Sequence, residues 1–200
     1  MIPIIIWNTH GMGARVKSDF LVTEIKKHKV CVIAILEHKQ NSDRIVDFTH
    51  RINMHSGLHA EPDNKHIWVF WNKAVDVVLV KAGDQYLTVK INNGIDVFFV
   101  SFVYGSCDSQ RREVLWKNLD CFDSEGLPWI VGGDFDIISE PGEKKGRGVF
   151  PRTASRSFVQ FMARRGLSDI GFSGDCFTWC HNQKGNARSW SRLDRCLENL

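Results

Sequence analysis

The stretch Trp129–Asp136, with the sequence WIVGGDFD, decides how this chain of 200 residues is read. Its apolar first half follows Leu127-Pro128, a pattern typical of a buried strand bounded by turn residues. Along an extended backbone, Asp134 and Asp136 would share one face while Phe135 points into the core. Such an acidic pair predicts a site for a metal or an attacked water, and an Asx-capped turn is the alternative.

Composition and net charge limit the classes of protein to which this chain can belong. The chain is 43% hydrophobic and 24% charged, with a formal net charge of +3, which is typical of a globular domain with a core and permits a polyanionic substrate without demanding one. No apolar run approaches the length of a membrane span, and the amino terminus does not have the pattern of a signal peptide. We therefore expect a single domain over residues 1–200 and no membrane partner.

Polar side chains also follow other apolar runs. The predicted strand Ile2–Trp7 delivers Asn8, whose amide can orient a metal ligand or touch a phosphate, although a turn cap is the alternative. The run Val30–Leu36 ends on Glu37, a hard oxygen donor suited to Mg²⁺ or else a solvated residue leaving a strand. A third apolar run ends at Tyr104, whose phenol can donate to a phosphate, and an interface tyrosine is equally common.

Periodicity predicts the remaining elements. Helices are expected over Lys17–His28, Asp43–Ile52, Asp108–Phe122 and Ser155–Arg165. In the third helix, Asp108 is the expected N-cap and Val114 belongs to the expected apolar stripe. Consecutive strands of one antiparallel sheet are expected over His66–Trp71, Ala74–Val80, Tyr86–Ile91 and Ile95–Tyr104. Surface positions are expected for His38, Lys39, Arg111 and Arg112.

The segment Ser139–Thr153 is rich in Gly, Lys and Arg. It is long and polar for a core connection, so we expect a mobile loop. Phosphate contacts carry most of the non-specific affinity of proteins for nucleic acids. The basic side chains of this segment are therefore candidates for contact with a nucleic-acid backbone: Lys144, Lys145, Arg147 and Arg152.

Six groups of residues form an ordered set along nearly the whole chain. They are Ile6–Gly13, Leu36–Lys39, Val103–Gly105, Trp129–Asp136, Gly171–Gly174 with Phe177–Trp179, and Gly185–Arg188 with Arg192–Arg195. In this order they resemble the motifs of the endonuclease/exonuclease/phosphatase superfamily. The likeness is greater to the apurinic/apyrimidinic-type endonuclease domain of plant non-LTR (LINE) retrotransposons.

This resemblance implies an α/β fold of the DNase I-like kind, a four-layer sandwich of two packed mixed β-sheets flanked by helices. It also implies Mg²⁺- or Mn²⁺-dependent hydrolysis of phosphodiester bonds, expected here as nicking of DNA. Phosphoryl transfer depends on charge neutralisation and an in-line nucleophile. Carried over by position, Glu37 would bind the metal with support from Asn8, Tyr104 would contact the scissile phosphate, Asp134 would activate water, and Asp194 would orient a general-base histidine.

Two departures from the family pattern predict impaired cleavage. The family has Gly-Asp-Phe-Asn where this chain has Gly133-Asp134-Phe135-Asp136, so a carboxylate replaces an amide donor. Two like charges about 6 Å apart cost about 2–3 kcal/mol at an effective dielectric of about 20. The closing Ser-Asp-His motif, with its general-base histidine, is also absent after Arg195, and the last strand is expected to be missing. General acid–base help is worth ~10²–10⁴-fold.

Two other functions remain open alongside the endonuclease. One is a catalytically dead remnant that still binds DNA, and the other is a phosphatase of the same superfamily acting on inositol or lipid phosphates. For the leading hypothesis we expect DNA as the partner, a monomer without an obligate protein partner, and the nucleus in preference to the cytoplasm.

Overall fold

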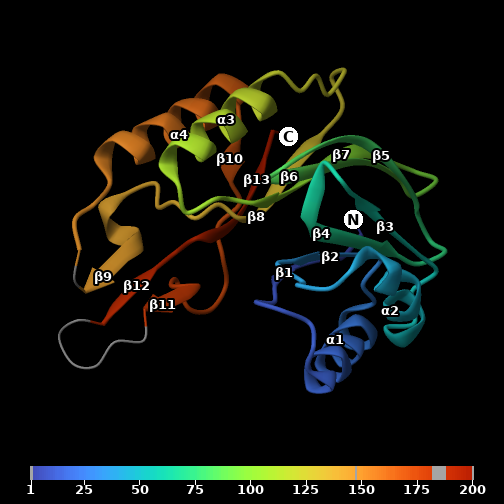
Figure 1. Ribbon diagram of the computed structural model, residues 1–200. Helices are drawn as coiled ribbons and strands as arrows, with labels where there is room; N and C mark the ends of the chain where they lie inside the picture. Colours follow the sequence, from blue (N-terminus) through green and yellow to red (C-terminus); the bar gives the residue numbers. More distant parts are fainter. Residues whose placement is uncertain (1, 147, 182–187, 200) are drawn as a thin grey trace.

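Two mixed β-sheets pack face to face in the computed structural model, which describes residues 2–146, 148–181 and 188–199 (Figure 1). The four-stranded sheet has the order β1-β2-β4-β3, with β1 (Ile4–Asn8), β2 (Val32–Leu36), β3 (Ser56–Ala60) and β4 (Asn64–Trp71). The six-stranded sheet has the order β10-β13-β8-β7-β6-β5. Its strands are β5 (Asp76–Gly83), β6 (Tyr86–Asn92), β7 (Val97–Tyr104), β8 (Trp129–Asp134), β10 (Ser168–Asp169) and β13 (Asp194–Glu198).

Helices cover the outer face of each sheet (Figure 1). The four-stranded sheet carries α1 (Arg15–His28) and α2 (Ile45–Arg51), and the six-stranded sheet carries α3 (Ser109–Asp120) and α4 (Arg152–Arg165). Two short 3-10 helices, η1 (Ser42–Arg44) and η2 (Pro141–Glu143), complete the helical part of the described chain. The predicted four-layer α/β sandwich is confirmed. Over the described residues, no helix is both long and apolar enough to cross a membrane.

Three apolar cores hold the layers together. β-branched and other aliphatic side chains fill the space between the sheets. An aromatic cluster holds α3 and α4 to the six-stranded sheet, where Trp116 stacks on Phe135 and Phe161. Burial of each such side chain contributes about 1.5–3 kcal/mol. Since Phe135 is fully buried in this cluster, the residue between the two aspartates anchors their segment to the core, as predicted.

The two sheets approach closely where β1 faces β8. A Cβ added to Gly132 would lie 2.6 Å from Cδ1 of Ile6, so a larger residue at this position would require the Ile6 side chain to shift. Gly132 therefore packs against β1, and the strand continues through both glycines to Asp134. This close approach brings the carboxyl ends of β1 and β8 to the same rim of the molecule.

The prediction of one antiparallel sheet from four consecutive strands is wrong in part. β5, β6 and β7 do pair in this way, but β4 pairs with β2 and β3 in the other sheet. Residues 72–75 carry the chain from one sheet to the other, and apolar periodicity indicates a strand without identifying its partner. β3 was not predicted, because its sequence SGLHA has little apolar alternation.

The expectation of a mobile loop over Ser139–Thr153 also needs correction. This segment contains η2, the strand β9 (Lys144–Gly146) and the start of α4. β9 joins β12 (Ser189–Ser191) and β11 (Trp179–His181) in a small third sheet. Another correction concerns Val114, which is 53% exposed although its spacing predicted a place in the apolar stripe of α3. The N-cap Asp108 is confirmed, since its side chain accepts a hydrogen bond from the backbone N–H of Gln110.

Candidate active site

Four strands end or begin at one rim of the sandwich. Asn8 ends β1, Tyr104 ends β7, Asp134 ends β8, and Asp194 begins β13. In the six-stranded sheet Asp134 lies between Tyr104 and Asp194, which are its register partners on either side. Across the sheets, Nδ2 of Asn8 donates to Oδ2 of Asp134 at 2.8 Å. The structure therefore brings these four predicted site residues together.

Glu37 joins this group from the end of β2. Its Oε1 lies 2.8 Å from Nζ of Lys39, and its Oε2 lies 2.6 Å from Nδ1 of His10. Burial raises the pKa of Glu37, but the bonds to Lys39 and His10 outweigh it and hold that pKa below its ordinary value. Burial and then the Glu37 carboxylate raise the pKa of Tyr104, which shows that the phenol faces the same acidic group.

The Asp134 carboxylate accepts two hydrogen bonds, one on each oxygen. Its Oδ1 accepts from the backbone N–H of Asp136 at 3.0 Å, which is the Asx turn considered as the alternative, while its Oδ2 faces Asn8. Burial raises the pKa of Asp134, and the bonds from Asp136 and Asn8 oppose that rise in part. Gly133 makes the turn possible, because its φ is +139° and an added Cβ would lie 2.1 Å from the carbonyl oxygen of Val103.

Asp136 is oriented differently from the sequence-based prediction. The extended backbone ends at Asp134, and Asp136 itself has φ +47°, so the argument from strand alternation does not hold there. Its Oδ2 lies 3.2 Å from Nη1 of Arg112. Burial and the charge of Asp134 raise the pKa of Asp136, and Arg112 opposes that shift. Arg112 is itself buried, which corrects the expectation of a solvated face.

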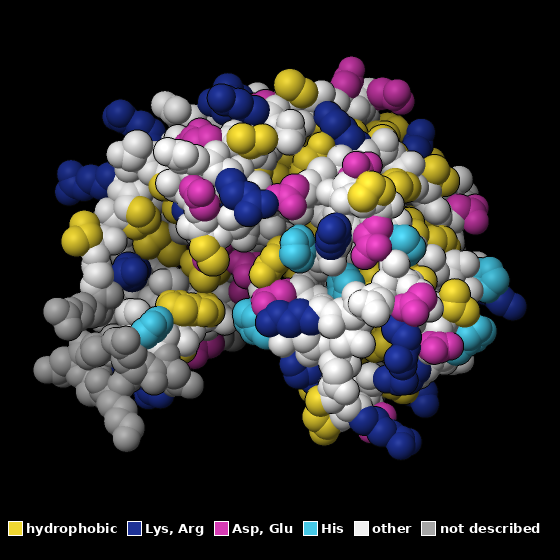
Figure 2. Space-filling model, in the orientation of Figure 1, with side chains coloured by type: hydrophobic (Ala, Val, Ile, Leu, Met, Phe, Trp, Pro, Cys, Tyr) yellow, Lys and Arg dark blue, Asp and Glu magenta, His cyan; other side chains and the backbone are white. Residues whose placement is uncertain are grey.

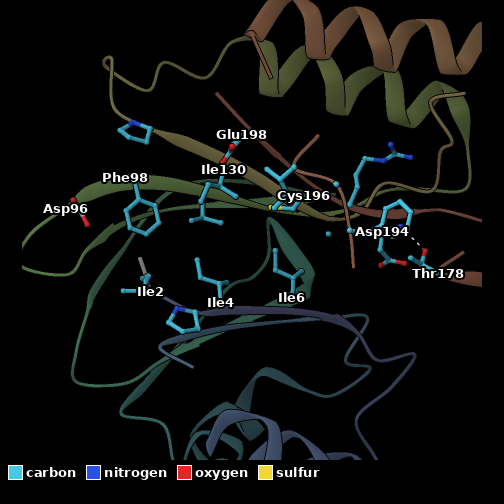
Figure 3. Close-up of a pocket in the computed structure, with 18 of the residues that line it drawn as sticks. Ile2, Ile4, Ile6, Asp96, Phe98, Ile130, Thr178, Asp194, Cys196 and Glu198 are labelled. Carbon is cyan, nitrogen blue, oxygen red and sulfur yellow. Dashed lines mark hydrogen bonds between the residues drawn. The ribbon is translucent and has the colours of Figure 1, made fainter. Parts of the chain in front are cut away.

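Asp194 lies beside Thr178, whose Oγ1 accepts from the backbone N–H of Asp194 at 3.1 Å. Figure 3 shows the two side by side at one end of a groove. Burial and the charge of Asp134 raise the pKa of Asp194 to about 6. A positive charge on His10 would oppose the shifts of both carboxyls.

The donor set fits a hard divalent cation held through few protein ligands. Among the residues that the structure describes, no group of three or more His, Cys, Asp or Glu side chains is arranged to hold a metal. Glu37 with the amide oxygen of Asn8 offers oxygen donors only, which suits Mg²⁺ because it keeps several of its waters. Lys39 and His10 now surround the Glu37 carboxylate with donors, so a cation at Glu37 would compete with the Lys39 ammonium group.

The predicted phosphate-binding residues lie to one side of this rim. Lys144 and Lys145 belong to β9, and Nζ of Lys145 lies 5.7 Å from the ring centroid of Trp190. Arg152 is the first residue of α4. Arg147 lies outside the described residues, as do residues 185–187 of the matched motif. In Figure 2, acidic, histidine and basic side chains lie together near the centre of this face, and further basic side chains lie at its edges.

Sequence reasoning missed several residues that shape the site. Lys39 is exposed, as expected, and its ion pair with Glu37 was not anticipated. His38 was expected at the surface, but it is buried and stacked on Trp68. Nζ of Lys17 donates to the carbonyls of Thr9 and Gly11 and so fixes the loop after β1. The only signal for Lys39 was its place two residues after Glu37. Nothing in the local pattern marks Lys17 or Arg112, because their partners lie on other segments.

No protein-family model matches the sequence, and no curated protein matches it either. Solved structures do match, and each alignment covers 98% of this chain. The endonuclease domain of TRAS1, a telomere-specific non-LTR retrotransposon, aligns over 84% of its own length with 15% identity and a TM-score of 0.70. The AP endonuclease LMAP from Leishmania major aligns over 78% of its length with 15% identity and a TM-score of 0.74. TDP2 from D. rerio, in complex with a single-strand DNA product, aligns over 83% of its length with 15% identity and a TM-score of 0.67.

At this level of identity the likeness establishes the fold. The chain has the DNase I-like α/β sandwich fold that its motifs predicted.

Proposed function

We propose that this protein is a phosphodiester hydrolase of the endonuclease type, which acts on DNA with a divalent metal. One observation carries the proposal. Side chains from β1, β7, β8 and β13, together with Glu37 after β2, meet at one rim of a sandwich whose structural neighbours are nucleases. Titratable groups with shifted pKa values that gather at a rim are typical of catalytic sites.

The proposed chemistry assigns each group a task that its environment suits. Glu37, with Asn8 in support, would hold the metal, which supplies charge neutralisation for the phosphate. Burial raises the pKa of Asp134, so its carboxylate would accept a proton from the attacking water more readily than a solvated one. Tyr104 stays a protonated donor because its pKa is raised, and it would donate to a phosphate oxygen. Asp194 would orient a histidine that serves as the general base.

We further propose that the domain derives from a retroelement and that its cleavage is weak. The first part is supported by the ordered motifs and by the TRAS1 endonuclease domain among the structural neighbours. The second is supported by the acidic Asp136 at a position where the family has an amide. Arg112 lies against Asp136 and offsets part of the cost of this second charge.

A DNA-binding domain without cleavage is the second candidate. It is favoured by the bonds from Lys39 and His10 to both oxygens of Glu37, since they occupy the carboxylate that a metal would need. On this view, Lys144, Lys145 and Arg152 would bind the DNA backbone. The acidic residues at the rim would then take no part in catalysis.

A plasmid assay separates the two candidates. Supercoiled plasmid is incubated with the protein and Mg²⁺ or Mn²⁺, and relaxed circles are measured over time for the wild type, for Asp134→Ala and for the matched control Asp19→Ala, whose side chain lies exposed on α1. We expect slow metal-dependent nicking that falls ~10²-fold or more in Asp134→Ala. The control should retain the wild-type rate.

Two other outcomes would contradict the proposed hydrolase. Salt-dependent binding of a fluorescent duplex without any nicking would overturn the hydrolase and support the DNA-binding domain. Release of inorganic phosphate from inositol phosphates, with no action on DNA, would overturn both. Circular dichroism spectra of the variants establish that a lost activity does not reflect a lost fold.

A further inference from the structure

Two histidine–carboxylate pairs occur among the residues that the structure describes, and one of them lies in the candidate active site. Nδ1 of His10 lies 2.6 Å from Oε2 of Glu37, the carboxylate that would hold the metal. In the other pair, Nε2 of His28 lies 3.2 Å from Oε2 of Glu24 at the carboxyl end of α1. The proposed hydrolysis uses Glu37 but gives the His10 imidazole no task.

The backbone holds both members of the His10–Glu37 pair in place. His10 has φ +47° and Glu37 has φ +52°, in the left-handed region that residues other than glycine rarely adopt. Such conformations persist only where the surrounding structure fixes them. The N–H of Gly11 donates to the carbonyl of Glu37 at 2.8 Å. Nζ of Lys17 donates to the carbonyls of Thr9 and Gly11, so the loop that carries the imidazole is fixed on both sides of His10.

The spacing of the two side chains suits two ligands of one metal ion. Neighbouring ligands around an octahedral ion with bonds of about 2.1 Å lie about 3 Å apart. Nδ1 of His10 and Oε2 of Glu37 are 2.6 Å apart, so a small outward rotation of the ring admits an ion between them. The His10 side chain is 63% exposed, which leaves room for that rotation. A neutral imidazole protonated on Nε2 presents the lone pair of Nδ1 to the ion.

The Lys39 ammonium group leaves this position open. Its Nζ lies 2.8 Å from Oε1 of Glu37, which is the oxygen that His10 does not contact. Binding of an ion at Oε2 ends only the contact with His10, so the bond between Lys39 and Oε1 can remain. Repulsion from the ammonium group weakens the binding of every divalent ion alike. A preference for one ion over another therefore depends on His10.

We propose that His10 is a ligand of the metal ion and makes the site selective for a transition-metal ion that accepts an imidazole, such as Ni²⁺, Co²⁺ or Zn²⁺, over Mg²⁺. Imidazole nitrogen suits such ions, whereas Mg²⁺ prefers oxygen ligands and keeps several waters. This reverses the preference expected from the oxygen donors of Glu37 and Asn8 alone. The inference rests on Glu37 as the metal ligand of the proposed function.

Metal titrations of the full chain in the absence of DNA test the inference. Calorimetry with Mg²⁺, Mn²⁺, Co²⁺ and Ni²⁺ gives the affinity for each ion. In the wild type we expect Ni²⁺ to bind roughly 100-fold more tightly than Mg²⁺, with Mn²⁺ and Co²⁺ between them in that order. His10→Asn should lower the affinity for Co²⁺ and Ni²⁺ by about tenfold or more and change that for Mg²⁺ by less than about twofold. Asn tolerates the left-handed backbone at this position, so the loop is retained.

Two further variants serve as matched comparisons. His28→Asn removes the imidazole of the pair on α1 and should leave the tight site unchanged. Lys39→Gln should raise the affinity for all four ions by a similar factor, because it removes a charge and no ligand. Proton NMR of the Co²⁺ complex identifies the ligand directly: a strongly shifted imidazole N–H signal should be present in the wild type and in His28→Asn, and absent in His10→Asn.

The proposal is overturned if His10→Asn binds Co²⁺ and Ni²⁺ as tightly as the wild type, or if it loses affinity for Mg²⁺ to the same extent. In either case the nuclease would stand with oxygen ligands alone, provided that Glu37→Gln abolishes Mg²⁺ binding. Conversely, binding of Ni²⁺ that depends on His10, without any nicking of plasmid, would support the metal ligand and overturn the hydrolase. Circular dichroism spectra confirm that each variant is folded.

Discussion

Nδ2 of Asn8 lies 2.8 Å from Oδ2 of Asp134, although 126 positions separate the two residues in the sequence. Asn8 belongs to the four-stranded sheet and Asp134 to the six-stranded one. An amide N–H that donates to a carboxylate favours its ionised form. This bond therefore both joins the sheets at the site and keeps Asp134 available as a base.

Replacement of Asn8 by Asp should damage both functions of this bond. The new carboxylate cannot donate when ionised and adds a like charge beside Asp134. We expect the free energy of unfolding at pH 8 to fall by about 1–3 kcal/mol, and nicking to fall with it. Urea unfolding and the plasmid assay measure the two effects. Asn118→Asp, on the exposed face of α3, is the matched control, and equal losses in the two variants would contradict the prediction.

Asp194 should make stability depend on pH. Its pKa is raised to about 6 from an ordinary value of 3.8, so the folded state prefers the protonated form. That contribution to stability is present in acid and is lost as the pH rises through about 6. We expect Asp194→Asn to raise the free energy of unfolding at pH 8 by about 1–3 kcal/mol relative to the wild type, and to change it little at pH 4. Urea unfolding in EDTA from pH 4 to 8 should show the difference grow; parallel curves would rule it out.

Glu37 should determine metal binding. A ligand that binds only the folded state raises the unfolding midpoint with its concentration. We expect 10 mM Mg²⁺, a concentration about tenfold above a millimolar Kd, to stabilise the wild type by about 1.4 kcal/mol and to have little effect on Glu37→Gln. Thermal unfolding with and without the ion measures the shift, and Glu113→Gln on α3 is the control. An equal shift in Glu37→Gln would place the metal elsewhere.

Asp136 should restrain binding of DNA. Substitution by Asn removes a negative charge next to Asp134 and restores an amide that can donate to a phosphate. Arg112 can still donate to the amide oxygen, so we expect the fold to be retained. DNA affinity should rise severalfold, as measured by fluorescence anisotropy, and any nicking should rise with it. Asp123→Asn, in the exposed loop after α3, should leave affinity unchanged. Weaker binding of Asp136→Asn would refute this account.

Lys145 should contribute a phosphate contact. Removal of one such contact weakens binding for all sequences and lowers the slope of log affinity against log salt by about 0.9 for duplex DNA. We expect this change in Lys145→Ala and none in Lys26→Ala, which alters an exposed residue of α1. Titrations at four salt concentrations measure the slope. An unchanged slope in Lys145→Ala would remove β9 from the DNA interface.

The fold could be predicted largely because each buried strand appears in the sequence as a short, continuous apolar run. Runs such as Val30–Leu36 are apolar at nearly every position, and a polar residue at the end of each run marked the rim. The motif order then identified the sandwich. What the sequence did not indicate is which sheet a strand joins, since β4 and β5 have similar patterns and lie in different sheets.

The site was predictable only in part, for a related reason. Asn8, Glu37, Tyr104, Asp134 and Asp194 each end or begin a strand, so sheet geometry alone brings them together. The residues that form hydrogen bonds and ion pairs with this group lie on helices and loops, away from the strand ends. Arg112 reaches Asp136 from the first turn of α3, and Lys17 fixes the loop after β1 from the first turn of α1. Such contacts depend on how helices pack on the sheets, so no regular spacing in the sequence indicates them.

The buried Glu143 has a consequence for synthesis of the chain. Its carboxylate is held by Arg192 and Arg195, which follow it by 49 and 52 residues. A nascent chain that has emerged only as far as β10 carries this carboxylate with no cation to meet it, and an unpaired charge resists burial. We therefore infer that the segment around η2 packs only after Arg192 and Arg195 have emerged, and that a ribosome stalled before Arg192 displays it open to proteases.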